Sequence, residues 1–260
     1  MCRFLICMNT FPEILFDFVF NYEHSIINQS YQKAYTPYLR KPNLNCDINM
    51  DGFGLGWKNE YSDEFNYYKN TIPIRNDINL KEILKNIRTK LAFIHIRANT
   101  LNLLAPISSI NTHPFTINNH IWMHNGQIKN FNDIKKNIVS NIDSDILSSI
   151  KGNTDSEYCF GMYLTLLKKY NKIKSMFLLI KIIKDTNQEA LLNFAVSNGN
   201  WVIATRYSIK SKYQPLSLYY NKKSNIISSE PLEKNNNNWK LVPKNSIIII
   251  ENNKLKIIKS

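Results

Sequence analysis

The sequence lacks an apolar run of the length that a membrane-spanning helix requires. Such a helix needs about 20 apolar residues in succession, and stretches such as FLICM near the start are far shorter. FLICM is also too short for the apolar core of a signal peptide, and no small-residue cleavage site follows it. Because 43% of the 260 residues are hydrophobic, the chain can still bury a sizeable core. We expect one cytoplasmic domain over residues 2–260, with no membrane association.

The sequence also lacks paired cysteines. Its four cysteines form no CxxC motif that could join histidines in a zinc site. Isolated cysteines of a cytoplasmic chain stay reduced. We therefore expect neither a disulfide nor a metal or other cofactor, and we expect Cys7 and Cys159 to pack in the core.

Arginine is scarce, since it supplies only 6 of the 33 basic residues. A net charge of +13 is common among nucleic-acid-binding proteins, but surfaces that bind phosphates use arginine as well as lysine. Lysine, asparagine and isoleucine are all abundant, as a bias toward A/T-rich codons would produce. Basic clusters such as LLKKYNKIK (166–174) are typical of solvated helix faces. The charge alone therefore does not favour nucleic-acid binding.

The apolar patterning predicts a mixture of strands and helices. The expected strands before the C-terminal region are 2–8, 52–59, 91–97 and 120–126. The expected helices are 12–23, 79–90, 153–170 and about 172–184. From residue 190 onward the pattern is β-rich, beginning with a hairpin around the turn SNGN (197–200).

Two helix starts carry capping signals. Thr154 and Glu157 match the T-x-x-E capping box, which places Asp155 in the first turn near the positive end of the helix dipole. Asn79 is the expected N-cap of the helix at 79–90.

Cys2 is the residue of greatest chemical interest near the start. A cysteine in an apolar strand usually only packs. If Met1 is removed, however, Cys2 carries a free α-amine beside its thiol. An α-amine titrates near ~7.7–8.0, so it can accept the thiol proton near neutral pH and activate a nucleophile without a histidine.

Three other polar segments follow expected strands or begin a helix. They are HIRANT (95–100), WMHNGQIKNF (122–131) and GNTDSE (152–157). An arginine at a strand end can clamp a carboxylate, although a surface ion pair is its commoner fate. Asn-Gly is commonly a tight turn, and an aspartate in a first turn simply favours the helix. Each segment has a structural explanation when taken alone.

Taken together, Cys2, HIRANT, HNG and TDSE occur in an order that resembles the class II, or N-terminal-nucleophile, glutamine amidotransferases. Further stretches are similar to the stand-alone members of this family, in particular the amidotransferase-like subunit of fungal glutathione degradation: HSIINQS (24–30), DGFGLGW (51–57), NTHPF (111–115), LLNFAVSNG (191–199) and SEPLE (229–233). The resemblance covers essentially the whole chain. It implies an α+β fold, the four-layer αββα sandwich of two antiparallel sheets flanked by helices.

The resemblance also implies a catalytic set. Cys2 is the expected nucleophile, which forms a thioester with a glutaminyl or γ-glutamyl carbonyl carbon. The side-chain amide of Asn125 and the backbone N–H of Gly126 are the expected oxyanion hole.

Substrate-binding roles follow from the same resemblance. Arg97 is expected to hold the α-carboxylate of the substrate and Asp155 its α-ammonium group. Thr100 and His113 are expected to line the pocket. His95 and His124 are expected to be structural.

Three functions remain open from the sequence. The favoured one is hydrolysis of the γ-glutamyl amide of glutamine or of glutathione-like compounds, for which the resemblance implies a metallopeptidase-like partner protein. We expect 260 residues to leave no room for a synthase domain, and Ala98 stands where several synthase-linked members carry an aromatic residue. A second is a glutaminase that supplies ammonia to a separate synthase chain. A third is a catalytically silent basic scaffold or RNA-binding protein, which salt-sensitive RNA retention would support.

Overall fold

A computed structural model describes residues 2–31, 49–98, 106–211, 215–233 and 237–259. Two sheets occupy its middle, and every strand pairing within them is antiparallel. The first has the order β11-β9-β10-β1-β4-β2-β3. Its strands are β1 (Arg3–Ile14), β2 (Phe53–Lys58), β3 (Phe65–Asn70), β4 (Arg88–Ile96), β9 (Tyr219–Asn221), β10 (Ile226–Ser228) and β11 (Trp239–Leu241).

The second sheet has the order β13-β12-β8-β7-β6-β5. Its strands are β5 (Phe115–Ile117), β6 (His120–Ile128), β7 (Ala190–Ser197), β8 (Trp201–Ile209), β12 (Ser246–Glu251) and β13 (Lys254–Lys259). The hairpin expected around residues 197–200 is confirmed as β7 and β8.

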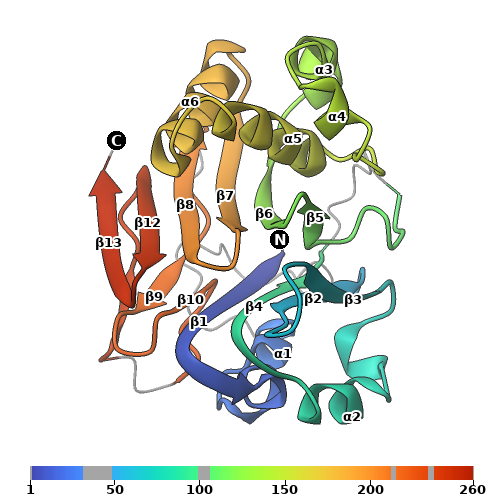
Figure 1. Ribbon diagram of the computed structural model, residues 1–260, viewed down its shortest axis with the longest axis vertical. Helices are drawn as coiled ribbons and strands as arrows, with labels where there is room; N and C mark the ends of the chain where they lie inside the picture. The colour runs from blue at the N-terminus through green and yellow to red at the C-terminus, as the bar shows by residue number, and fades with distance from the viewer. Residues whose placement is uncertain (1, 32–48, 99–105, 212–214, 234–236, 260) are drawn as a thin grey trace.

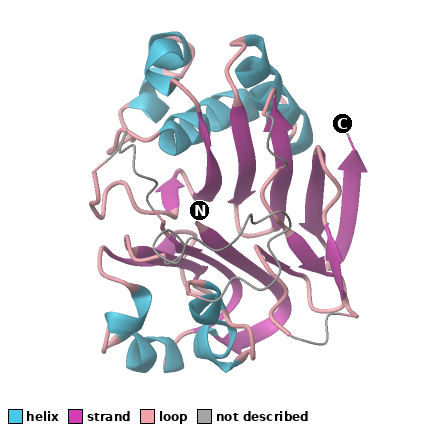
Figure 2. Cartoon of the chain, turned by 180° about the vertical axis from the view of Figure 1, so that it is seen from behind, coloured by secondary structure: helices cyan, strands magenta, loops and turns pink. Residues whose placement is uncertain are grey.

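Helices cover the outer face of each sheet, and the chain begins between the two sheets (Figures 1 and 2). On the first sheet lie the π-helical turn η1 (Asp17–Asn21), α1 (Ile26–Gln29), the 3-10 turn η2 (Ile74–Asn76) and α2 (Leu80–Lys85). On the second lie α3 (Phe131–Val139), α4 (Ser144–Leu147), α5 (Asp155–Leu167) and α6 (Lys172–Asp185). The expected four-layer αββα sandwich is confirmed.

Three apolar cores separate these four layers. The core between the sheets contains Phe4, Phe93, Met123, Val202 and Ile248, all at most 1% exposed. A second core joins the first sheet to its helices through residues such as Leu5, Phe18 and Leu80. The third joins the second sheet to α3, α5 and α6 and is centred on Trp122, which stacks on Phe160 with ring centroids 5.5 Å apart.

Strand β1 brings residue 2 to the boundary between the sheets. Successive side chains of a strand point to opposite faces, so Phe4 enters the core between the sheets while Leu5 enters the helix-side core. β1 lies between β10 and β4, and Arg3 pairs with Ile96 at the last residue of β4. Cys2 therefore lies beside the segment that follows Ile96.

The helix expected at 12–23 is wrong in its first part. β1 continues to Ile14 after an irregularity between Met8 and Glu13, because Glu13 and Ile14 find strand partners in Thr89 and Arg88. These contacts span about 75 residues of sequence, and local patterning carries no information about them. Residues 15–21, which include η1, are helical in this region.

The helix expected at 79–90 is shorter than predicted. It ends at Lys85, and residues from Arg88 onward belong to β4. Asn79 makes no side-chain capping bond. The carboxylate of Asp77 accepts hydrogen bonds from the backbone N–H groups of Asn79 and Leu80 in its place, at 3.2 and 3.1 Å.

The capping expected for α5 is confirmed at Thr154. Its hydroxyl oxygen accepts a hydrogen bond from the backbone N–H of Glu157 at 3.2 Å. The Glu157 carboxylate accepts hydrogen bonds from the N–H groups of Lys151 and Gly152, so it ties the preceding loop to the helix.

We predict that Thr154→Ala lowers the free energy of unfolding by about 1 kcal/mol, because one N–H group at the start of α5 loses its acceptor. Asn171→Ala is the matched control, since Asn171 caps α6 through the N–H groups of Ile173 and Lys174. Urea unfolding should show a similar loss for both variants. An unchanged midpoint for Thr154→Ala would contradict the capping role.

Candidate active site

Cys2 is half-buried and lies against the end of β4. The backbone N–H of Ala98 points at the Cys2 Sγ atom, with a nitrogen–sulfur distance of 3.4 Å. The Sγ atom also lies 3.6 Å from the Ala98 carbonyl oxygen, to which the thiol can donate. Both polar groups of the Ala98 backbone thus contact the sulfur and hold it at the end of β4.

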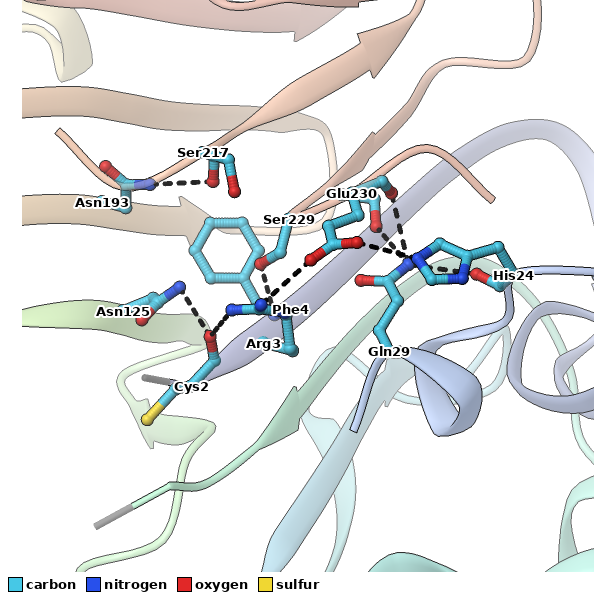
Figure 3. A network of polar contacts seen from close by, with 11 residues as sticks. Cys2, Arg3, Phe4, His24, Gln29, Asn125, Asn193, Ser217, Ser229 and Glu230 are labelled. Carbon is cyan, nitrogen blue, oxygen red and sulfur yellow. Dashed lines mark hydrogen bonds and ion pairs between the residues drawn. The ribbon is translucent and has the colours of Figure 1, made fainter. Parts of the chain in front are cut away.

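Asn125 connects Cys2 to the second sheet. It lies on β6, and its side chain is 2% exposed. Its Nδ2 atom donates a hydrogen bond to the Cys2 carbonyl oxygen at 2.9 Å (Figure 3). Because an amide nitrogen carries two hydrogens, one of them remains for another acceptor.

Gly126 follows on the same strand and adopts a φ of 151°. A Cβ atom at this position would lie 1.9 Å from the backbone oxygen of Leu191 on the paired strand β7. Only glycine therefore allows this close approach of β6 to β7. The close approach fixes the course of the backbone next to Asn125.

Arg97 immediately follows β4 and is 9% exposed. Its backbone N–H donates to the Gly52 carbonyl oxygen at 2.8 Å, which extends the pairing of β4 with β2. Its Nη1 atom donates to the Pro106 carbonyl oxygen at 3.4 Å. Since Arg97 immediately precedes Ala98, which contacts the Cys2 sulfur, Arg97 lies near Cys2.

Asp155 is the first residue of α5 and is held at the end of β6. Its Oδ2 atom accepts the backbone N–H of Ile128 at 2.8 Å, and its Oδ1 atom accepts that of Ser156 at 2.7 Å. Ile128 lies two residues beyond Gly126. The carboxylate retains further lone pairs for a ligand.

Three buried histidines, His95, His113 and His124, lie close to these residues in the sequence or in the sheets. The rings of His95 and His113 lie 4.3 Å apart, and the His95 Nε2 atom lies 3.3 Å from the His124 carbonyl oxygen. The His124 ring contacts the Ser156 hydroxyl at 2.9 Å and the Leu191 carbonyl oxygen at 3.0 Å. His95 and His124 thus bridge the two sheets and α5, as expected of structural residues.

Burial sets the charge of these histidines. It lowers the pKa of His95 to about 3, and it holds the pKa of His113 well below the usual 6.5. Burial also lowers the pKa of His124, partly offset by the nearby Asp155 carboxylate. All three rings are therefore neutral near neutral pH.

The structure thus brings together Cys2, Arg97, Asn125 and Gly126, with Asp155 attached two residues farther along β6. His113 lies beside His95 behind them. Thr100 lies outside the described residues. Within the described part of the chain, no group of three or more metal-ligating side chains occurs, and no helix is long and apolar enough to cross a membrane.

Sequence reasoning gave no role to Arg3, which lies next to Cys2. Its Nη1 atom donates to the Cys2 carbonyl oxygen at 3.1 Å, and its Nη2 atom contacts Glu230. Glu230 belongs to the segment SEPLE, and its other side-chain partner, His24, belongs to HSIINQS. Both segments were noted above only as parts of the resemblance.

We predict that the free energy of unfolding falls as pH drops below about 6.5. The histidines become protonated in the unfolded chain at that pH but stay neutral when buried in the folded protein. Each histidine with a lowered folded pKa contributes about 1.4 kcal/mol per pH unit between its unfolded and folded values. Urea midpoints should be nearly constant between pH 6.5 and about 8, where the lowered pKa of the half-buried Lys69 begins to contribute, and fall steeply below pH 6.5. His95→Gln should make the decline shallower; an unchanged slope would contradict the assignment.

Comparison with known proteins identifies the family of this chain. The family model for class-II glutamine amidotransferases matches residues 30–220. The yeast Saccharomyces cerevisiae protein named "Probable glutamine amidotransferase DUG3" is 31% identical over 96% of this chain and 82% of its own length.

Solved structures share the fold. A class-II glutamine aminotransferase domain protein from Silicibacter pomeroyi aligns over 99% of both chains with a TM-score of 0.68 and 21% identity. The glutamine phosphoribosylpyrophosphate amidotransferase of B. subtilis aligns over all of this chain and 49% of its own, with a TM-score of 0.63 and 16% identity. The chain belongs to the class-II glutamine amidotransferases, enzymes that act on the amide C–N bond of glutamine-type substrates.

Proposed function

We propose that this chain hydrolyses γ-glutamyl amide bonds through a thioester on Cys2. The main support is the meeting of three separate segments at one residue. The Cys2 thiol receives the N–H of Ala98, next to Arg97, while the Cys2 carbonyl receives the amide of Asn125. A nucleophile, an oxyanion donor and a carboxylate clamp are the groups that amide hydrolysis needs.

In the proposed reaction, the free α-amine of Cys2 takes the thiol proton and the sulfur attacks the γ-carbonyl carbon. A C–S bond forms, and the carbonyl electron pair moves to oxygen. The Asn125 N–H not used by the Cys2 carbonyl, together with the N–H of Gly126, stabilises this oxyanion. A donor in this position is typically worth about 3–4 kcal/mol in the transition state.

Collapse of the intermediate breaks the C–N bond, and the leaving nitrogen takes the proton from the α-ammonium of Cys2. Water, deprotonated by the same amine, then attacks the thioester. The C–S bond breaks, the thiol is restored and a free glutamyl carboxylate leaves. No proton carrier beyond Cys2 is needed, which fits the lowered pKa values of His95 and His124, because burial makes both rings poor proton acceptors.

Two opposite charges select the substrate in this proposal. Arg97 holds the α-carboxylate bidentately, and Asp155 holds the α-ammonium group. Only γ-linked glutamyl groups present both charges, because an α-linked peptide has no free α-carboxylate. The proposal also gives His113 a place in the lining of the pocket.

The finer assignment is a glutathione-like γ-glutamyl substrate. It rests on the resemblance to the fungal glutathione-degrading subgroup and on Ala98, which replaces the aromatic residue of several synthase-linked members. The proposal includes a metallopeptidase-like partner and a cytoplasmic location for a single domain over residues 2–260. Membership of an enzyme family favours these assignments over a silent scaffold.

We predict that Cys2→Ala abolishes hydrolysis of glutamine, γ-glutamylcysteine and glutathione while the protein stays folded, because the nucleophile is lost. The control is Cys7→Ala, which removes a buried thiol that is 1% exposed and should keep the activity. A coupled assay for released glutamate measures both variants and ranks the three substrates.

Retention of Met1 provides an independent check on the amine. Protein whose intact mass includes Met1 should be inactive, and removal of Met1 by an aminopeptidase should restore hydrolysis. Full activity with Met1 in place, or in Cys2→Ala, would contradict the mechanism.

We predict opposite kinetic effects for the two groups that flank Cys2. Arg97→Ala removes binding energy from the substrate carboxylate, so KM should rise more than kcat falls. Asn125→Ala removes a transition-state donor, so kcat should fall about 100-fold or more with a smaller change in KM. Steady-state kinetics distinguish the two patterns, and an unchanged kcat would exclude Asn125 from the oxyanion hole.

A further inference from the structure

A buried ionic network extends from Arg3, the neighbour of Cys2, through Glu230 to His24 (Figure 3). Arg3 Nη2 and Glu230 Oε1 are 2.9 Å apart, and His24 Nε2 lies 2.8 Å from Glu230 Oε2. The side chains of Arg3, His24 and Glu230 are 2%, 8% and 0% exposed. Both oxygens of one carboxylate are therefore fixed by side chains from separate parts of the chain.

The backbone around Glu230 is fixed as well. Gln29 Nε2 donates to the carbonyl oxygens of Glu230 and His24, both at 3.2 Å. Ser229 exchanges two hydrogen bonds with Phe4, through its own N–H and through its hydroxyl oxygen. Glu230 thus has little freedom to move relative to β1.

Arg3 transmits this rigidity to Cys2. Its second terminal nitrogen, Nη1, donates to the Cys2 carbonyl oxygen at 3.1 Å, the same oxygen that accepts Asn125 Nδ2 at 2.9 Å. A guanidinium group is a planar, rigid fork. When Glu230 holds one arm, the position of the other arm is determined.

A nucleophile at a chain terminus has a particular need for such support. Once Met1 is gone, Cys2 has no preceding residue, and terminal residues are poorly ordered unless other contacts hold them. Burying an ion pair is costly in free energy compared with apolar packing. Because the Arg3 guanidinium also donates to the Cys2 carbonyl, the Arg3–Glu230 pair has a role beyond stability.

We propose that Arg3, oriented by Glu230 and His24, is a positioning residue for the reaction. It fixes the Cys2 carbonyl, and through it the α-amine and thiol of Cys2 and the amide plane of Asn125. This inference rests on the proposed function of Cys2. It assigns roles to the segments HSIINQS and SEPLE, which supply His24, Gln29, Ser229 and Glu230.

The direct test is Arg3→Lys, which keeps the positive charge opposite Glu230 but removes the fork. Misplacement of reacting groups costs rate rather than binding, so kcat per folded protein should fall about tenfold or more while KM changes less than about twofold. Arg206→Lys is the matched control. Arg206 is a buried arginine on β8 that donates to the carbonyls of Leu216, Val242 and Pro215, and its replacement should lower stability without changing kcat.

His24 provides a second route if Arg3→Lys does not fold. His24→Ala removes the donor to Glu230 Oε2 and should lower kcat, whereas His24→Gln supplies a replacement N–H and should recover part of the loss. A purely structural role predicts lower stability in both variants with unchanged kcat per folded protein, which would overturn the proposal.

Cys2→Ala, assayed in parallel, distinguishes failure of the positioning role of Arg3 from failure of the proposed function of Cys2. If Cys2→Ala is inactive while Arg3→Lys and His24→Ala match the wild type, the positioning role is overturned and the proposed function stands. If hydrolysis survives in Cys2→Ala, the proposed function fails, and the positioning role fails with it. Loss of kcat in Arg3→Lys and His24→Ala, with recovery in His24→Gln, supports both.

Discussion

The hydrogen bond between the Asn125 amide and the Cys2 carbonyl is the contact on which the site depends. It joins Cys2, the residue before β1, to strand β6 of the second sheet. The N–H of Ala98 joins Cys2 to the end of β4 in the first sheet. Cys2 is thus held where two packed sheets meet. The register of β1 with β4, set by apolar residues on both faces of β1, decides which residue occupies that position.

The surrounding layers convert this contact into a defined chemical environment. Thr154 caps α5, and the Asp155 carboxylate accepts a hydrogen bond from Ile128 at the end of β6. Asp155 of the helix layer is therefore held beside the strand that carries Asn125 and Gly126. Burial keeps the adjacent His95 and His124 rings neutral. Because burial disfavours protonation of both rings, the α-amine of Cys2 is left as the base in the proposed mechanism. Arg3 then supplies the rigidity that a chain terminus lacks.

Sequence patterning predicted the elements whose signals are local. Thr154, the β7–β8 hairpin and the strands carrying Asn125 and leading to Arg97 were all predicted correctly. The helix predicted at 12–23 was wrong in its first part because distant strand partners at residues 88–89 extend β1 to Ile14. The capping prediction for Asn79 was wrong: the carboxylate of Asp77, two residues earlier, accepts the N–H groups of Asn79 and Leu80 instead. The Arg3–Glu230 pair spans 227 residues of sequence, so no local pattern could reveal it.

The central claim is that the Cys2 sulfur becomes covalently bound to the glutamyl group of the substrate. The most direct measurement is acid quenching of protein lacking Met1 during turnover, followed by digestion and mass spectrometry of the cysteine peptides. We expect a glutamyl adduct on the peptide that begins with Cys2 and an unmodified Cys7 peptide. Turnover with no adduct on Cys2, or with the adduct on another cysteine, would contradict the account.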